Sequence, residues 1–295
     1  MQIQANGIAL EIEDHGPPTG EPLLLVMGLG MQLLGWHEDF VALLVERGFR
    51  VIRYDNRDAG LSQQFDRAGT PNLAAASLRH LLGLRVRSPY TLREMAADAV
   101  GILDALGIRA AHVCGASMGG MIAQHMAVDA PDRVKSVTLM MTSSGARRLP
   151  GPSMKVRAAL MARPTEPTNL ETLVDHYVRL YRLIGSPGYP ADDAWLRPRL
   201  RMSLQRAYRP AGTARQMVAI AADGDRSALL PAIDRPVQVI HGRGDPLVPL
   251  PAGLDLAAKI RGAALDVIDG MGHDLPQVLW PRFVAGIASA AARAS

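Results

Sequence analysis

The chain has 295 residues, of which 48% are hydrophobic and 4% aromatic, and its formal net charge is +4. This length fits one large α/β domain with an insertion, or two domains, and the composition is that of a folded soluble protein. No uninterrupted apolar run reaches membrane-spanning length and no basic run is interleaved with aromatic residues, so we expect neither membrane insertion nor a nucleic-acid partner.

The first part of the chain alternates strand and helix patterns after an N-terminal hairpin. Asn6–Gly7 lies between two apolar runs, which is the strongest short signal for a β-hairpin. Thr91 and Glu94 form a capping box at the start of a helix. In chain order the expected elements are the hairpin over 3–13, a buried strand over 22–27, a helix over 38–47, a strand over 50–55 and a helix over 92–106. The segment 56–87 has no clear period and is expected to be irregular.

The second part continues this alternation on both sides of a helical block. In chain order the expected elements are a strand over 110–115, a helix ending near 130, a strand over 137–141, helices alone over 145–230, a strand over 236–240, a helix over 254–260, a strand over 264–268 and a last helix from about 276. The alternation predicts a mostly parallel, doubly wound sheet. We therefore expect a core domain of residues 1–144 and 231–295 with residues 145–230 inserted, and Thr168 with Glu171 capping one inserted helix.

A G-x-S-x-G motif, formed by Gly115, Ser117 and Gly119, lies between a predicted strand and a predicted helix. In this context the motif forms a nucleophile elbow. Glycine is needed on either side because a Cβ there would clash with the neighbouring strand and helix. The turn raises the Ser117 hydroxyl above the sheet and places it at a helix N-terminus, where unpaired N–H groups favour negative charge.

Ser117 needs a base, and His273 stands out among the eight histidines. It lies in the glycine-rich turn Gly270–His273 directly after the last predicted strand, and such sheets build their sites at the carboxyl ends of parallel strands. Asp245 follows the preceding strand and is expected to orient the histidine. Asp274 is the competing acid, but a sequence neighbour seldom points at the ring. The histidines interpreted as structural are His112, His125, His176 and His241.

Two backbone N–H groups are expected to bind an oxyanion, those of Met118 and of Leu29, with Gly28 as the alternative to Leu29. Flexible apolar side chains near these loops suit a hydrophobic ligand. The expected substrate-pocket residues are Met27, Gly28, Met31, Tyr177, Tyr181 and Met271. No metal-ligand spacing of His, Cys or carboxylates appears, so neither a metal nor an organic cofactor is expected.

The single cysteine and the N-terminal segment bear on the cellular location. Cys114 cannot form an internal disulfide and is interpreted as a small buried hydrophobic residue below the elbow. Met1–Gly7 lacks the basic and apolar regions of a signal peptide. A cytoplasmic location is the expectation.

The elbow and the chain order Ser117, Asp245, His273 resemble the α/β-hydrolase superfamily over essentially the whole chain. A closer resemblance, to the aclacinomycin methylesterase-like esterases, is carried by Val26–Gly28, Gly35–Trp36 and Ile52–Ser62. The superfamily more often has His-Gly where this chain has Met27–Gly28, and glycine where it has Asp58. The resemblance implies a sheet of about eight strands, a helical lid formed by the insertion, and a triad of nucleophile, acid and base in the order just given.

These observations predict a serine hydrolase that cleaves a carboxylic ester of a small to medium, largely apolar molecule through an acyl-enzyme on Ser117. A carbon–carbon bond hydrolase or a cofactor-free perhydrolase can use the same triad, and a binding protein of this fold could retain it. Residues 145–230 hold 14 Lys and Arg against 7 Asp and Glu. This excess could recruit anionic substrates, but we favour the interpretation that it coats the outer faces of amphipathic helices. The natural ester and the oligomeric state stay open.

Overall fold

A central eight-stranded sheet organises the protein, which is described as a computed structural model over residues 1–294. The strands are β1 (Gln2–Ala5), β2 (Ile8–His15), β3 (Glu21–Val26), β4 (Phe49–Tyr54), β5 (Ala111–Ala116), β6 (Val134–Met140), β7 (Val237–Gly242) and β8 (Ala264–Ile268). Their spatial order is β1-β2-β4-β3-β5-β6-β7-β8. Pairing is antiparallel for β1 with β2 and for β2 with β4, and parallel from β4 to β8. The predicted fold class is confirmed.

Helices cover both faces of this sheet. One face carries α1 (Glu38–Glu46) and α10 (Trp280–Ala292), whereas α3 (Leu92–Ala105), α4 (Met118–Asp129) and α9 (Pro251–Lys259) pack on the other. The central strands are buried on both sides, since every residue of β5 and β7 is buried. This explains why their sequences read as continuous apolar runs.

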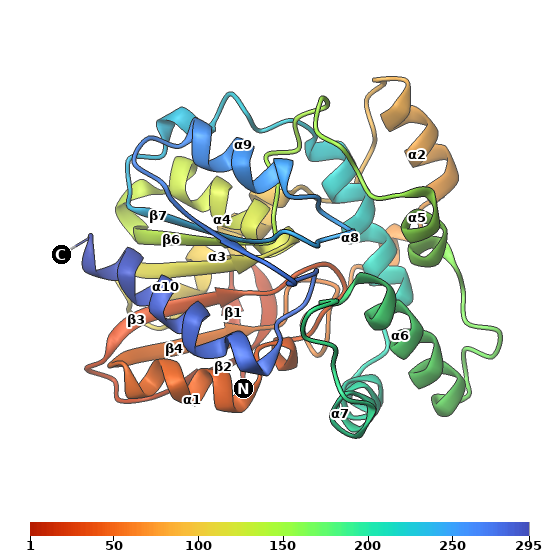
Figure 1. Ribbon diagram of the computed structural model, residues 1–295, viewed down its shortest axis with the longest axis horizontal. Helices are drawn as coiled ribbons and strands as arrows, with labels where there is room; N and C mark the ends of the chain where they lie inside the picture. Colours follow the sequence, from red (N-terminus) through yellow and green to blue (C-terminus); the bar gives the residue numbers. More distant parts are fainter. Residues whose placement is uncertain (295) are drawn as a thin grey trace.

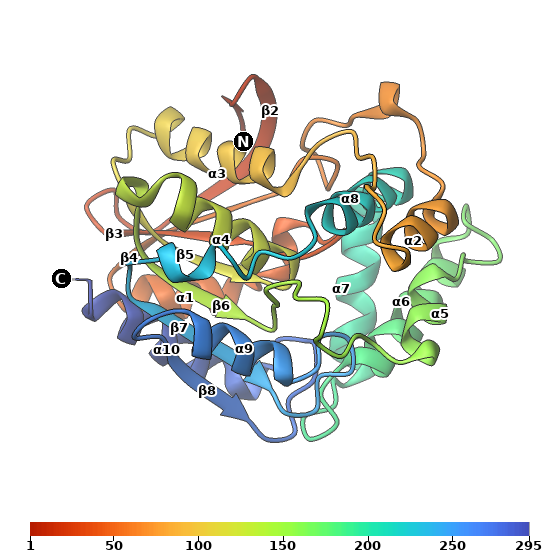
Figure 2. The same ribbon diagram turned by 90° about the horizontal axis from the view of Figure 1, so that it is seen from above.

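Four helices connect β6 to β7 and occupy one end of the molecule (Figures 1 and 2). They are α5 (Met154–Met161), α6 (Leu170–Ile184), α7 (Asp193–Arg206) and α8 (Pro210–Asp223). Val174, Val178 and Leu196 form a small apolar cluster between α6 and α7, separate from the two clusters on the sheet. No helix within residues 1–294 is long and apolar enough to cross a bilayer.

Local sequence signals located several elements correctly. The hairpin turn has Asn6 at φ 50° and Gly7 at φ 75°, the left-handed values that a tight hairpin requires. The capping box of α3 is present in both directions between Thr91 and Glu94. Buried Cys114 lies in β5, where desolvation raises the pKa of its thiol.

Two local predictions were wrong. The segment expected to be irregular contains α2 (Leu73–Leu81), whose first turn is capped by the Asn72 side chain. The cap of α6 is Asn169 rather than Thr168, because the Asn169 side chain accepts hydrogen bonds from the N–H groups of Glu171 and Thr172. The Asn169 cap serves the Glu171 N–H, which a cap at Thr168 would also have served, and in addition the Thr172 N–H.

Candidate active site

Ser117 lies at the sharp turn between β5 and α4, as the G-x-S-x-G motif predicts. Its φ of 53° is left-handed, which a non-glycine residue adopts only at a cost. A Cβ on Gly115 would lie 2.2 Å from the carbonyl oxygen of Gly119, and one on Gly119 would lie 2.0 Å from that of Val26. The close approach of the backbone therefore requires glycine at both positions, and the predicted sharp turn between β5 and α4 is present.

The structure brings His273 and Asp245 to this serine from two different loops. The Nε2 atom of His273 lies 3.0 Å from Ser117 Oγ, and its Nδ1 atom lies 2.7 Å from Asp245 Oδ2. Asp245 Oδ1 accepts hydrogen bonds from the N–H groups of Leu247 (2.9 Å) and Val248 (2.8 Å). These bonds fix the carboxylate so that it holds Nδ1–H and leaves Nε2 free to accept a proton. A hydroxyl in such a chain can attack a carbonyl carbon as its proton moves to the imidazole.

Asp274, the competing acid, is committed to another partner. It accepts a hydrogen bond from the Ser186 hydroxyl, and burial raises the pKa of its carboxyl. The same hydroxyl accepts the Gly272 N–H at 2.8 Å. Asp274 and Ser186 thus attach the segment after α6 to the histidine loop.

Three of the four histidines interpreted as structural have hydrogen-bond partners. His112 bonds Ser136 and His125 bonds Asp223, while His241 bonds the Val248 carbonyl. Desolvation lowers the pKa of His112, His176 and His241. Burial therefore favours the neutral form of these three rings.

The loop after β3 lies against Ser117. A Cβ on Gly28 would come within 3.2 Å of Ser117 Cβ and 3.8 Å of its hydroxyl oxygen. Neither the Leu29 N–H nor the Met118 N–H has an acceptor among residues 1–294. Two unpaired donors, one in the loop that lies against the serine and one at the helix N-terminus, are what an oxyanion would need.

Three side chains distant in sequence fix this loop. Asn56 donates its amide to the Met27 carbonyl at 2.9 Å, and Asp55 accepts the Leu33 N–H at 2.7 Å. Gln216 of α8 accepts the Gly30 N–H at 2.8 Å and donates to the Arg57 carbonyl at 2.8 Å. Sequence reasoning missed Gln216, because nothing local distinguishes it from any other helical glutamine.

The remaining pocket candidates lie in different environments. Met27 and Met271 are buried in the apolar cluster shared with α1 and α10, and Met31 is half-buried against it. Tyr177 and Tyr181 lie on α6, where burial raises the pKa of each phenol to about 12. Their assignment to a substrate pocket stays a prediction. No group of His, Cys, Asp or Glu within residues 1–294 is arranged to hold a metal ion.

Comparison with known proteins agrees with this fold. Residues 21–276 match the family described as alpha/beta hydrolase fold. The chain belongs to the α/β-hydrolase family. It is 31% identical to rhodomycin D methylesterase DauP of Streptomyces sp. strain C5, over 97% of this hydrolase and 95% of that protein. The corresponding methylesterase DnrP of Streptomyces peucetius is also 31% identical, over the same shares.

Solved structures show the same architecture. The enol-lactonase from Burkholderia xenovorans LB400 superposes with a TM-score of 0.74 at 25% identity, covering 98% of this hydrolase and 99% of that chain.

Asp58, where the superfamily more often has glycine, explains how α8 is held against the rest of the protein. Its φ of 67° is the left-handed conformation that glycine would favour. Arg215 of α8 binds both carboxylate oxygens at 2.7 Å, and the Tyr90 hydroxyl donates to Oδ2 at 2.8 Å. Both charged side chains are at most 1% exposed. A Cβ on Gly212 would lie 2.1 Å from the Asp58 carbonyl oxygen, so α8 packs directly on this turn. The departure from the family pattern was the available signal for this contact.

Proposed function

We propose that this α/β hydrolase is a serine esterase that cleaves a carboxylic ester through an acyl-enzyme on Ser117. The observation that carries the proposal is the hydrogen-bonded chain from Ser117 through His273 to Asp245. The similarity to two methylesterases over nearly the whole chain supports ester hydrolysis as the reaction class.

Each step of the proposed reaction has a candidate group. Ser117 attacks the ester carbonyl while His273 takes its proton, and the N–H groups of Leu29 and Met118 bind the oxyanion that forms. His273 then donates the proton to the leaving alcohol. Water attacks the acyl-enzyme with His273 again as base, which releases the acid and restores Ser117. Asp245 keeps the imidazole in the productive tautomer throughout.

We propose a neutral, largely apolar substrate beneath a lid formed by residues 145–230, with the core domain on either side. A methyl ester is the first candidate, after the names of the relatives. Most arginines of α6 to α8 have carboxylate partners, among them Arg182 with Asp193 and Arg201 with Glu171. These pairs neutralise most of the positive charge of α6 to α8, so they leave only a weak electrostatic field to attract an anionic substrate. We therefore expect kcat/KM for a neutral ester to change little with ionic strength. A preference for carboxylate-bearing esters that fades with added salt would contradict this.

The decisive experiment follows the acyl-enzyme directly. With an aryl ester, the wild-type protein should show a burst of alcohol and an intact mass increased by the acyl group. Ser117→Ala should abolish the adduct and lower kcat by roughly a thousandfold or more. Ser136→Ala removes another buried serine hydroxyl, which bonds His112 far from the elbow, and is the matched control. A Ser117→Ala variant with more than a tenth of the wild-type activity would falsify the nucleophile assignment.

Product analysis separates the competing functions. An alcohol and an acid identify an esterase, a cleaved diketone identifies a carbon–carbon bond hydrolase, and a peracid formed with peroxide identifies a perhydrolase. A protein that binds the aryl ester without turnover would be a binding protein instead.

A further inference from the structure

Helix α2 is an apolar helix that buries none of its own side chains. Leu78, Leu81, Leu82 and Leu84, on the helix and just after it, are 57%, 70%, 65% and 51% exposed. A nine-residue helix usually depends on packing of its apolar face for stability. Four neighbouring leucines in water are unlike the single exposed apolar residues of ordinary surfaces and indicate a contact surface.

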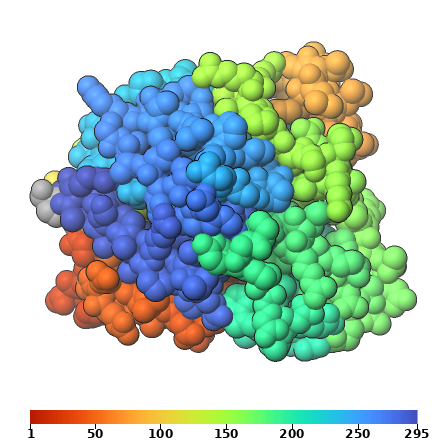
Figure 3. Space-filling view, viewed as in Figure 1, coloured from red at the N-terminus to blue at the C-terminus, as the bar shows by residue number. Residues whose placement is uncertain are grey.

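Helix α5 extends this surface. It lies next to α2 in both ribbon views and on the space-filling surface (Figures 1, 2 and 3). A Cβ on Gly83 would lie 2.9 Å from the Arg147 guanidinium, so the segment before α5 touches the end of α2. Met154 and Met161, at the two ends of α5, are 77% and 41% exposed. We call α2, α5 and their flanking residues the leucine–arginine face.

The two chain segments that form this face carry positive charge only. Residues 67–93 contain five arginines and no Asp or Glu, and residues 145–165 contain four arginines and one lysine and again no acid. Arg148 binds Asp255, but Arg79, Arg85, Arg87 and Arg147 have no carboxylate partner within residues 1–294. The unbalanced charge of the insertion is therefore concentrated here rather than on α6 to α8.

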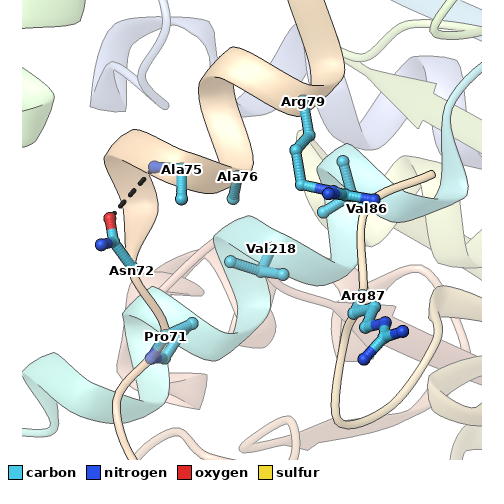
Figure 4. A pocket seen from close by; sticks show the side chains of 8 residues that line it. All are labelled: Pro71, Asn72, Ala75, Ala76, Arg79, Val86, Arg87 and Val218. Carbon is cyan, nitrogen blue, oxygen red and sulfur yellow. Dashed lines mark hydrogen bonds between the residues drawn. The ribbon is translucent and has the colours of Figure 1, made fainter. Parts of the chain in front are cut away.

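A groove between α2 and α8 lies within the same face (Figure 4). Its volume is about 440 Å³. Ala75, Ala76, Val86 and Val218 give it apolar walls, and Arg79 and Arg87 line it with guanidinium groups. Such a groove offers a phosphate two cationic partners beside apolar side chains.

We propose that the leucine–arginine face docks the protein onto the surface of an anionic lipid bilayer. The exposed leucines would enter the boundary between headgroups and acyl chains, while the arginines bind lipid phosphates. Exposed apolar side chains on two segments that carry cations and no acids match this surface in both polarity and charge. The protein lies on the bilayer and does not span it.

The charge also argues against the other occupants of this face. A second copy docking face to face would bring two sets of unpaired arginines together, and like charges in contact oppose association. An acidic protein could pair its carboxylates with the arginines, but those carboxylates would leave the four exposed leucines without an apolar partner.

The test measures binding of the intact protein to vesicles by co-sedimentation. Vesicles of phosphatidylglycerol with phosphatidylcholine should bind it at low ionic strength, vesicles of phosphatidylcholine alone should bind it weakly, and added salt should weaken binding. Leu81→Ser with Leu82→Ser should lower the partition coefficient by roughly tenfold or more without changing the charge. Arg85→Glu with Arg87→Glu should also abolish binding.

Matched controls lie elsewhere on the surface. Leu254 and Val278 are 46% and 68% exposed, so Leu254→Ser with Val278→Ser should leave binding unchanged. Arg47→Glu with Arg261→Glu changes the net charge as much as the pair at Arg85 and Arg87, and should reduce binding far less.

Three results would overturn the proposal. One is absence of binding to the phosphatidylglycerol vesicles at low salt. The second is equal loss of binding in the two glutamate pairs together with wild-type binding by the leucine pair, which would mean that general basicity is responsible. The third is a dimer in solution that the leucine pair dissociates. Hydrolysis of a water-soluble aryl ester should be the same in all these variants, so the vesicle result does not depend on the proposed reaction.

Discussion

The ion pair between Asp58 and Arg215 allows one prediction to be worked through from the structure. We consider Asp58→Gly, which installs the residue that the superfamily more often has. The change leaves the Arg215 guanidinium, 1% exposed, without its bidentate partner, and removes the acceptor of the Tyr90 hydroxyl. Breaking a buried pair in this way costs about 3–5 kcal/mol. Glycine relieves the left-handed strain at φ 67°, which is about 1–2 kcal/mol. The free energy of unfolding should therefore fall by about 1–4 kcal/mol.

Urea unfolding at neutral pH, followed by tryptophan fluorescence, measures this change. Arg215→Met should also destabilise the protein, because it leaves the Asp58 carboxylate buried without a cation. The double variant should be less destabilised than the sum of the two single variants by at least about 1 kcal/mol, since no charge is left unpaired. Asp66→Asn is the matched control, because Asp66 also contacts Arg215 but is 80% exposed. Additive effects, or an Asp58→Gly variant as stable as wild type, would refute the reasoning.

Further predictions concern the site and the buried histidines. Asp245→Asn should lower kcat by roughly a thousandfold or more, whereas Asp274→Asn should cost far less; steady-state kinetics giving the reverse order would move the acid to Asp274. Gln216→Leu should lower kcat roughly ten- to hundredfold with little change in KM, because the Gly30 N–H loses its acceptor and the loop that carries the Leu29 N–H shifts; an unchanged kcat would remove Gln216 from a positioning role. Desolvation lowers the pKa of His112, so the unfolded chain binds a proton more readily, and the free energy of unfolding should fall as the pH drops below about 6.5. Chemical unfolding across pH should show a smaller fall in His112→Gln, and an identical fall would exclude this histidine as a contributor.

The sequence predicts those features whose cause is local. A hairpin turn, a capping box and an elbow are each fixed within a few residues, by a left-handed φ or by a close approach that only glycine permits. The three loops that bring Ser117, Asp245 and His273 together follow from a parallel sheet, because the carboxyl ends of its strands share one edge. The contacts of Gln216 could not be predicted in this way. It lies 186 residues from Gly30, and the pairing exists only after α8 has packed on the core.

Helix α2 was missed for a different reason. Its leucines and alanines do not form a face that is buried, so the pattern that identifies most helices of soluble proteins carries little information there. The cap at Asn72 was the remaining signal, and an asparagine after a proline is as typical of a turn as of a helix start. The helix that could not be predicted from the sequence is thus the one whose exposed surface supports the docking proposal.

The contacts of α2 and of the four helices between β6 and β7 divide these five helices into an anchored group and a loosely packed one. Helix α8 is tied to the core by Arg215 and Gln216, and the end of α6 is tied to the histidine loop by the 2.7 Å bond from the His273 N–H to the Ile184 carbonyl. Helix α5 buries only Val156, and α2 buries nothing. Segments with few buried apolar contacts open at the lowest free-energy cost, so access beneath the proposed lid should open through α5 while α8 holds the loop beside the serine. The leucine–arginine face consists of α2 and α5 with their flanking residues. Contact with a bilayer would therefore act on the helices that the core holds least, and would leave intact the hydrogen bonds that position the proposed oxyanion donors.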